Sequence, residues 1–336
     1  MTKDNKLFAL YPCCVVVDGK TKSAIYDLQR ENFWLIPHAL AHLLKHDKHL
    51  SVSEMKKKYH GNDTAIDEYM RFLSDNDLGL FCQKDEIKFR SIPQEVYNPH
   101  LITNAIFDYD NDSFYDLHEG IRQLDKMGCE NLELRFFGEM SMERLEEVVS
   151  HTKKTCIRDL EILVPYNNDM QLGNILELRY RNSRIRKVTI SGCPKEKESI
   201  YNHEEIYIIY TSEAITSESH CGVFSSWYLL PKTELYIESL FYNNCLNRKV
   251  SIDRLGNIKN CPSMKNSYGK FDGKQQLIDI VKRNDFQKLW KIRKDEIHQC
   301  SDCELRYMCQ DCRAYTIDPD DVFSKPIKCK YNPYES

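Results

Sequence analysis

The spacing of apolar residues changes twice along the chain and predicts three structural units. In residues 7–92, two strand-like segments flank the turn sequence Asp18-Gly19, which predicts a β-hairpin. A third short strand and three amphipathic helices follow, the second helix opening with a capping-box pattern at Ser51. The predicted strands are residues 7–17, 21–30 and 33–36, with a β-wing expected over 78–90. These elements predict a small winged-helix-like domain.

Residues 98–230 show a different period, in which apolar strand candidates alternate with amphipathic helices. The strands begin near Ile102, Leu132, Ile157 and Ile185, and two more are expected over Ile206–Tyr210 and Val223–Leu229. The first helix runs from Ser113, with Phe114, Leu117, Ile121 and Leu124 facing inward, and ends at Gly128. The alternation predicts βαβ units and therefore a parallel sheet or barrel. The fold class expected for the whole chain is α/β.

The last unit, residues 240–336, is rich in cysteine. Two cysteine groups are separated by an amphipathic segment that begins near Leu277. The weakest joints lie near residues 91–99 and 231–234, so we expect domains over 1–95, 96–235 and 236–336.

Composition and charge limit the classes of function. With 41% hydrophobic and 29% charged residues and a net charge of −4, the chain has no general attraction to nucleic acid or anionic membranes. No apolar run approaches the ~20 residues of a membrane span, and the segment 7–17 lacks the features of a signal peptide. We therefore expect a cytoplasmic protein with neither nucleic acid nor membrane as a partner. In that compartment, 14 cysteines favour metal ligation or redox chemistry over disulfides.

Half of the cysteines form a compact array near the C-terminus. The order is Cys-x10-Gly-x4-Cys, a gap of 38 residues, Cys-x2-Cys-x5-Cys-x2-Cys and a last cysteine. The array comprises Cys245, Cys261, Cys300, Cys303, Cys309, Cys312 and Cys329. Zinc is the alternative to iron–sulfur clusters, but zinc knuckles are usually separated by a dozen residues or more, and only five separate the two pairs here. Seven thiols overfill one four-thiolate site and nearly fill two, which favours clusters. The other seven cysteines are expected to fill the core.

This array resembles that of SPASM domains, except that two residues rather than three separate Cys309 from Cys312. The resemblance implies two 4Fe–4S clusters. One would be held by Cys300, Cys303, Cys309 and Cys329, and the other by Cys245, Cys261 and Cys312. The position that carries a further ligand in fully ligated relatives is Ser239 here. The site of Cys245, Cys261 and Cys312 would then have an iron without a protein ligand, which is the preferred expectation, or would take Cys221 as its fourth ligand.

SPASM domains usually follow a radical S-adenosylmethionine (SAM) barrel, and residues 98–230 resemble a degenerate partial (β/α) barrel of that kind. The expected CxxxCxxC loop is absent from the chain, and residues 109–115 contain no cysteine. Of the family's Gly-Gly-Glu-Pro turn, only Gly138 and Glu139 are retained. We therefore expect neither SAM binding nor radical chemistry.

The full chain resembles the SPASM-domain peptide maturases of grasp-with-spasm systems, most clearly at residues 25–37 and 303–315. The resemblance implies two partners, a ribosomal precursor peptide and an ATP-grasp ligase. The N-terminal unit resembles PqqD-type elements, which bind a leader peptide at a sheet edge beside a helix. The residues implied in that groove are Phe33, Trp34, Tyr69, Arg71 and Phe72.

Three functions follow from these patterns. The leading hypothesis is a cluster-bearing accessory protein that binds a precursor peptide and presents it to the ligase. The second is a peptide-modifying enzyme that uses an open iron for redox or Lewis-acid chemistry. The third is a zinc-stabilised interaction module. The patterns leave open whether the chain itself catalyses a step, since no nucleotide-binding or hydrolase motif occurs.

Overall fold

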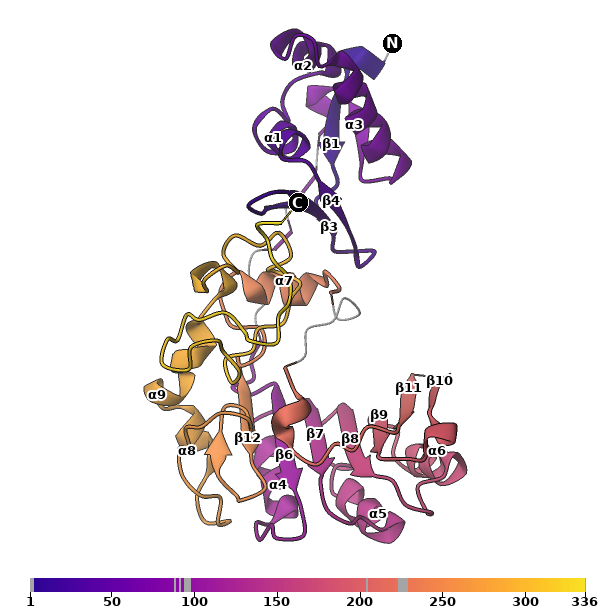
Figure 1. Ribbon diagram of the computed structural model, residues 1–336, viewed down its shortest axis with the longest axis vertical. Coiled ribbons are helices and arrows are strands. Elements are labelled where there is room, and N and C mark those ends of the chain that lie inside the picture. The colour runs from indigo at the N-terminus through magenta and orange to yellow at the C-terminus, as the bar shows by residue number, and fades with distance from the viewer. Residues whose placement is uncertain are drawn as a thin grey trace.

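The computed structural model describes residues 3–87, 89–90, 92–93, 98–203, 205–222 and 229–335. The molecule is elongated (Figure 1), with the N-terminal unit at one end and a large sheet at the other. Most of the cysteine-rich segment lies between them, and the C-terminus lies near β3 and β4. No helix in the described ranges is both long enough and apolar enough to cross a bilayer.

Two small antiparallel sheets and three helices form the N-terminal unit. Its strands are β1 (Leu7–Leu10), β2 (Cys14–Asp18), β3 (Ser23–Asp27), β4 (Asn32–Ile36) and β5 (Gly79–Cys82). Its helices are α1 (His38–His46), α2 (Val52–Lys58) and α3 (Asp63–Asp75). Strands β2, β3 and β4 pair in that order, which confirms the hairpin around Asp18-Gly19. Ser51 caps α2 through the predicted capping box.

One detail of the predicted hairpin is wrong. The expected strand over residues 7–17 is two strands, because β1 pairs with β5 while β2 pairs with β3. The break contains Pro12, which has no backbone N–H to donate to a ladder. In the segment predicted as a wing, residues 78–90, the strand β5 ends at Cys82 and pairs with β1.

The second sheet has eight strands in the order β10-β11-β9-β8-β7-β6-β12-β13. Its strands are β6 (Asn104–Tyr109), β7 (Asn131–Phe136), β8 (Asp159–Pro165), β9 (Ile185–Ser191), β10 (Ser199–His203), β11 (Ile206–Thr211), β12 (Lys249–Ile252) and β13 (Ile258–Lys259). The strands from β11 to β12 run parallel, and only the edge strands β10 and β13 pair antiparallel. The four strands predicted by the βαβ period are therefore confirmed. The strand expected over Val223–Leu229 falls almost wholly outside the described residues.

Three crossover helices cover one face of this sheet: α4 (Leu117–Lys126), α5 (Met142–Ser150) and α6 (Leu172–Arg181). Figure 1 shows α4 and α5 on the side away from the N-terminal unit. Gly128 ends α4 with a φ of 76°, as predicted. The inward orientation predicted for Phe114 is wrong, since its side chain is 96% exposed. The helix starts later than expected, at the cap Asp116, so Phe114 lies in the preceding loop and outside the helical register.

Strand β12 belongs in sequence to the cysteine-rich segment, yet it extends the parallel sheet beside β6. Helix α7 (Thr233–Ser239) directly precedes this segment, and α8 (Leu277–Val281) and α9 (Asn284–Gln287) lie within it. Helix α8 packs against α4, where the Leu277 N–H donates to Oε1 of Gln123 at 2.7 Å. The sheet therefore crosses the boundary expected at residue 235, and the last two units share one core.

The β2–β3 hairpin rests on the loop that carries Cys300, Cys303 and Cys309. Tyr26 donates its hydroxyl to the Glu304 carbonyl at 2.5 Å, and Arg306 Nη1 donates to the Asp18 carbonyl at 2.6 Å. The Lys20 N–H donates to the Asp302 carbonyl at 2.8 Å. The N-terminal unit is thus joined to the cysteine-rich segment by two side-chain hydrogen bonds to backbone carbonyls and one backbone–backbone hydrogen bond.

The tight turn of this hairpin gives a stability prediction. A Cβ at Gly19 would lie 2.7 Å from the Lys22 carbonyl oxygen and 2.8 Å from the Glu304 nitrogen, both backbone atoms. Gly19→Ala should therefore destabilise the protein by about 1–3 kcal/mol, measured by urea unfolding. The control is Gly173→Ala in α6, where a Cβ has nothing within 4 Å and should be neutral or stabilising. Equal midpoints for the two variants would contradict the docked arrangement.

Candidate metal centre

A cavity of about 560 Å³ separates the inner face of the large sheet from the cysteine-rich segment. Sheet residues on its wall are mostly polar, among them Glu133, Glu161 and Lys187. Six cysteines and two lysines also line it: Cys221, Cys245, Cys261, Cys309, Cys312, Cys329, Lys249 and Lys294. The fold thus brings five of the seven array cysteines to one cavity, together with Cys221 from outside the array.

The β12–β13 turn positions the first part of the array. Gly256 occupies the left-handed region with a φ of 76°, which a side chain would disfavour. Oδ1 of Asp253 accepts the N–H groups of Leu255 and Asn257 at 3.0 and 2.9 Å, closing the turn that leads to Cys261. The glycine in the Cys-x10-Gly-x4-Cys pattern therefore has a backbone role.

The first group of thiols consists of Cys245, Cys261 and Cys312 with Cys221. Burial raises the pKa of Cys312, and Cys245 and Cys221 raise it further. Burial and the same two neighbours raise the pKa of Cys261 to about 12. Lys249 lies among them, with Nζ 3.6 Å from Sγ of Cys245.

The second group consists of Cys300, Cys303, Cys309 and Cys329. Burial raises the pKa of Cys300 most, and Cys309 and Cys329 raise it further. Burial raises the pKa of Cys303 to about 12, with Cys309 and Cys300 contributing. Lys294 lies beside this group, with Nζ 3.6 Å from Sγ of Cys309 and 3.9 Å from Sγ of Cys300.

Beside the second group, two buried cations contact one carboxylate, and a second buried acidic residue, Glu304, lies next to Cys303. Lys294 and Arg313 are buried, and both pair with Asp311, whose carboxylate lies 3.4 Å from Lys294 Nζ and 2.6 Å from Arg313 Nε. Two cations thus share one carboxylate, and an isolated buried charge is costly. Thiolates bound to metal would supply the compensating negative charge.

The distances between the array sulfurs bear on the kind of metal group. Thiolates around a single tetrahedral zinc ion, with Zn–S bonds of about 2.3 Å, lie about 3.8 Å apart. Among the described residues, the one group of three or more potential ligand atoms within 4.8 Å of each other is Cys13, Cys14 and Asp27. The array sulfurs are therefore more widely spread than a single-ion site requires. A cubane distributes its thiolates over four irons, so its ligand sulfurs lie farther apart than those around one ion.

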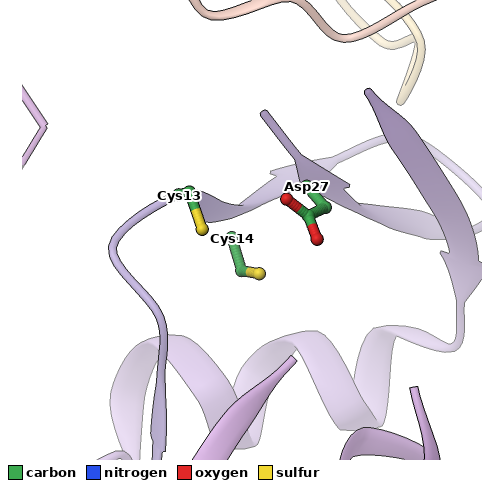
Figure 2. A group of neighbouring side chains, drawn as sticks. All are labelled: Cys13, Cys14 and Asp27. Carbon is green, nitrogen blue, oxygen red and sulfur yellow. The ribbon is translucent and has the colours of Figure 1, made fainter. Parts of the chain in front are cut away.

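Figure 2 shows the compact group Cys13, Cys14 and Asp27 in the N-terminal unit. Asp27 already accepts the N–H groups of Gln29 and Arg30, each at 3.0 Å, and pairs with the Arg30 guanidinium at 2.8 Å. Its carboxylate closes the turn between β3 and β4. Burial raises the pKa of Cys14, which keeps its thiol protonated. The group has the contacts of a structural turn.

The loop after β6 occupies the place where the barrel resemblance implies a CxxxCxxC segment. Tyr115 is buried there, donates its hydroxyl to the Asp108 carbonyl at 2.6 Å and packs edge-to-face on Tyr109. A Cβ at Gly138 would lie 2.4 Å from Oδ1 of Asn111, so the retained glycine makes room for this loop. Aromatic packing fills this corner of the sheet.

The five candidate peptide-binding residues lie on different sides of the N-terminal unit. Phe33 packs with Val17 and Leu305 in the cluster that joins this unit to the cysteine-rich segment. Trp34, Tyr69 and Phe72 are half-buried at the margin of the N-terminal core, and Arg71 is exposed. The side chain of Phe33 thus points away from Trp34, because neighbouring residues of a strand face opposite sides.

Sequence reasoning missed three polar features of the site. Lys249 and Lys294 appear as ordinary surface residues in the sequence, although each lies beside a cysteine group. The third is Asp108 with Arg135, a pair on the inner face of the sheet in which each side chain is 1% exposed. Charged residues within predicted apolar strands were the available signal for this pair.

Comparisons with known proteins give limited information. No family model matches the chain, and neither does any curated protein. Solved structures of SuiB from Streptococcus suis align along its length. The form bound to S-adenosylmethionine has 11% identity and a TM-score of 0.36 over 98% of this chain and 99% of that one. The form bound to the precursor peptide SuiA has 9% identity and a TM-score of 0.32 over 97% and 100%. Similarity at this level carries no argument about function.

The buried pair Asp108–Arg135 gives a second prediction. Its two hydrogen bonds measure 2.6 and 2.8 Å. Arg135→Met should destabilise the protein by about 3–5 kcal/mol, because it leaves a buried carboxylate without its partner. Arg186→Met is the matched control: its ion pairs with Asp159 and Glu205 are partly exposed, so it should cost about 1 kcal/mol or less.

The same variant should show a characteristic pH dependence. Burial raises the pKa of Asp108 to about 7 even beside Arg135, which lowers it. In Arg135→Met that pKa rises further, so the folded state binds a proton that the unfolded state releases near pH 4. The loss of stability relative to the wild type should therefore grow with pH above about 7, where the wild-type carboxyl ionises and that of the variant stays protonated, by up to about 1.4 kcal/mol per unit. A pH-independent cost in urea titrations would contradict this account.

Proposed function

We propose that this chain is an iron–sulfur protein that binds two 4Fe–4S clusters at the inner face of its parallel sheet. The supporting observation is the gathering of distant cysteines into two groups, each beside a lysine, along one cavity. Soft thiolates select iron–sulfur clusters and zinc, and the spread of these sulfurs favours clusters. Such clusters, when bound, supply electron transfer or a rigid support.

The chain's own residues would tune these clusters. Lys294 and Lys249 place positive charge next to thiolates, which stabilises the anionic form and raises the reduction potential. Lys294 is held in place by Asp311, which Asn243 and Arg313 orient in turn. A chain of contacts thus links Asn243 to Asp311, Asp311 to Lys294, and Lys294 to the second group.

We further propose that the protein acts in the maturation of a ribosomally made precursor peptide, with an ATP-grasp ligase as partner. The support is the sequence resemblance to SPASM peptide maturases, together with an available edge on the N-terminal sheet. β4 is the last strand in the order β2-β3-β4, and its Leu35 is 47% exposed. An edge strand of this kind can accept a peptide as an added strand.

Metal analysis tests the cluster proposal. After anaerobic purification or reconstitution, the full chain should contain about eight irons and eight acid-labile sulfides, as two cubanes require. Cys309→Ala should lose about half of both, because Cys309 belongs to the second group only. The control is Cys193→Ala, at a buried cysteine two residues after β9, and it should keep the full content. Zinc without sulfide would overturn the proposal in favour of a zinc module.

A peptide-binding assay tests the proposal that the chain binds a precursor peptide. The probe is a fluorescent synthetic copy of the peptide encoded by a short reading frame beside the gene. Arg71→Glu should weaken binding at least about tenfold by anisotropy if α3 forms the groove wall. The control Arg158→Glu reverses an exposed arginine just before β8, whose side chain is 75% exposed, and should leave the affinity unchanged. No binding by the wild-type chain would refute the role as a peptide carrier.

A further inference from the structure

Residues 218–222 lie directly against the cysteine-rich segment. Lys328 Nζ donates to the carbonyl oxygens of Ser219 and Cys221 at 2.6 and 2.5 Å. The Glu218 carbonyl accepts from the hydroxyls of Ser263 and Tyr315 at 3.3 and 3.4 Å. Four hydrogen bonds from three separate parts of the cysteine-rich segment thus hold a short stretch whose own backbone forms little regular structure.

Gly222 shows how close this stretch comes to the first cysteine group. It has a φ of 77°, and a Cβ built there would lie 2.9 Å from Sγ of Cys312. The backbone next to Cys221 therefore touches the Cys312 sulfur. Cys221 itself lines the same cavity as Cys245, Cys261 and Cys312.

Building on the proposed clusters, we infer that Cys221 supplies the fourth thiolate of the first cluster. The first site then consists of Cys221, Cys245, Cys261 and Cys312, and the second of the four cysteines already assigned to it. Eight thiols form two complete four-thiolate sites, and each thiol releases its proton to solvent when it binds iron. Ser239, at the position where relatives carry a ligand, donates its hydroxyl within α7 to the Leu235 carbonyl at 2.6 Å.

A complete first site changes the chemistry available to the protein. A cubane with four thiolates has no open iron for a substrate oxygen or nitrogen to bind. The first cluster would then serve electron transfer or structure, and Lewis-acid chemistry on a peptide at this iron would be excluded.

The experiment uses excess cyanide, which binds an iron that lacks a protein ligand, and electron paramagnetic resonance of the dithionite-reduced full chain. The wild-type spectrum should not change on adding cyanide, and that of Cys221→Ala should. Cys193→Ala is the control and should behave as the wild type. The signal of the second cluster, which keeps all its ligands, reports that each variant is folded.

Each other outcome overturns the inference. A wild-type spectrum altered by cyanide would mean an open iron. A Cys221→Ala chain that keeps the signals of both clusters and ignores cyanide would mean that another residue is the fourth ligand. In both cases the proposed clusters stand. A wild-type chain without iron and acid-labile sulfide would overturn the proposed function itself, and this inference with it.

Discussion

Buried positive charge beside sulfur is the constraint on which the centre of this structure depends. Lys294 is 5% exposed and has one carboxylate, Asp311, which it shares with Arg313. A buried cation needs negative charge nearby, and after Asp311 the groups that lie close to Lys294 Nζ are the thiols of Cys309 and Cys300. The folded shape of the cysteine-rich segment and the ionisation of its cysteines are therefore linked. This link gives the proposed clusters a structural role as well as a chemical one.

The two faces of the large sheet differ in polarity and in what they pack against. The outer face buries apolar side chains under α4, α5 and α6 and carries most of the core. The inner face is polar, contains the buried pair Asp108–Arg135 and forms one wall of the cavity. Because β12 joins this sheet, the cysteine-rich segment cannot shift without disturbing the parallel ladder. The cavity is thus framed by backbone hydrogen bonds on one side and by cysteine loops on the other.

The N-terminal hairpin connects the proposed site of peptide recognition to the second cysteine group. Tyr26 and Gly19 contact Glu304, the residue directly after Cys303. The free edge of β4 belongs to the same three-stranded sheet as this hairpin. A peptide bound at that edge would lie one strand away from the hairpin strand that rests on a cysteine loop. This continuity offers a physical route by which peptide binding and the state of the second cluster can influence each other.

The sequence by itself determined the local elements and the type of chemistry. The 25–30-residue period placed β6 to β9, Asp18-Gly19 placed the hairpin, Ser51 capped α2 and Gly128 ended α4, since these signals depend on neighbours along the chain. The clustered cysteines likewise indicated metal binding. The split of the first strand at Pro12 and the exposure of Phe114 were missed, because each depends on which partner or register a segment adopts.

Only the tertiary structure decided how these parts meet. It added β12 to the large sheet, turned Phe33 toward the cysteine-rich segment and placed Lys249 and Lys294 next to sulfur. It also brought Cys221, 24 residues before Cys245 in the sequence, to the first cysteine group. No local pattern encodes such pairings, because they arise from contacts between segments far apart in sequence that form together when the core closes.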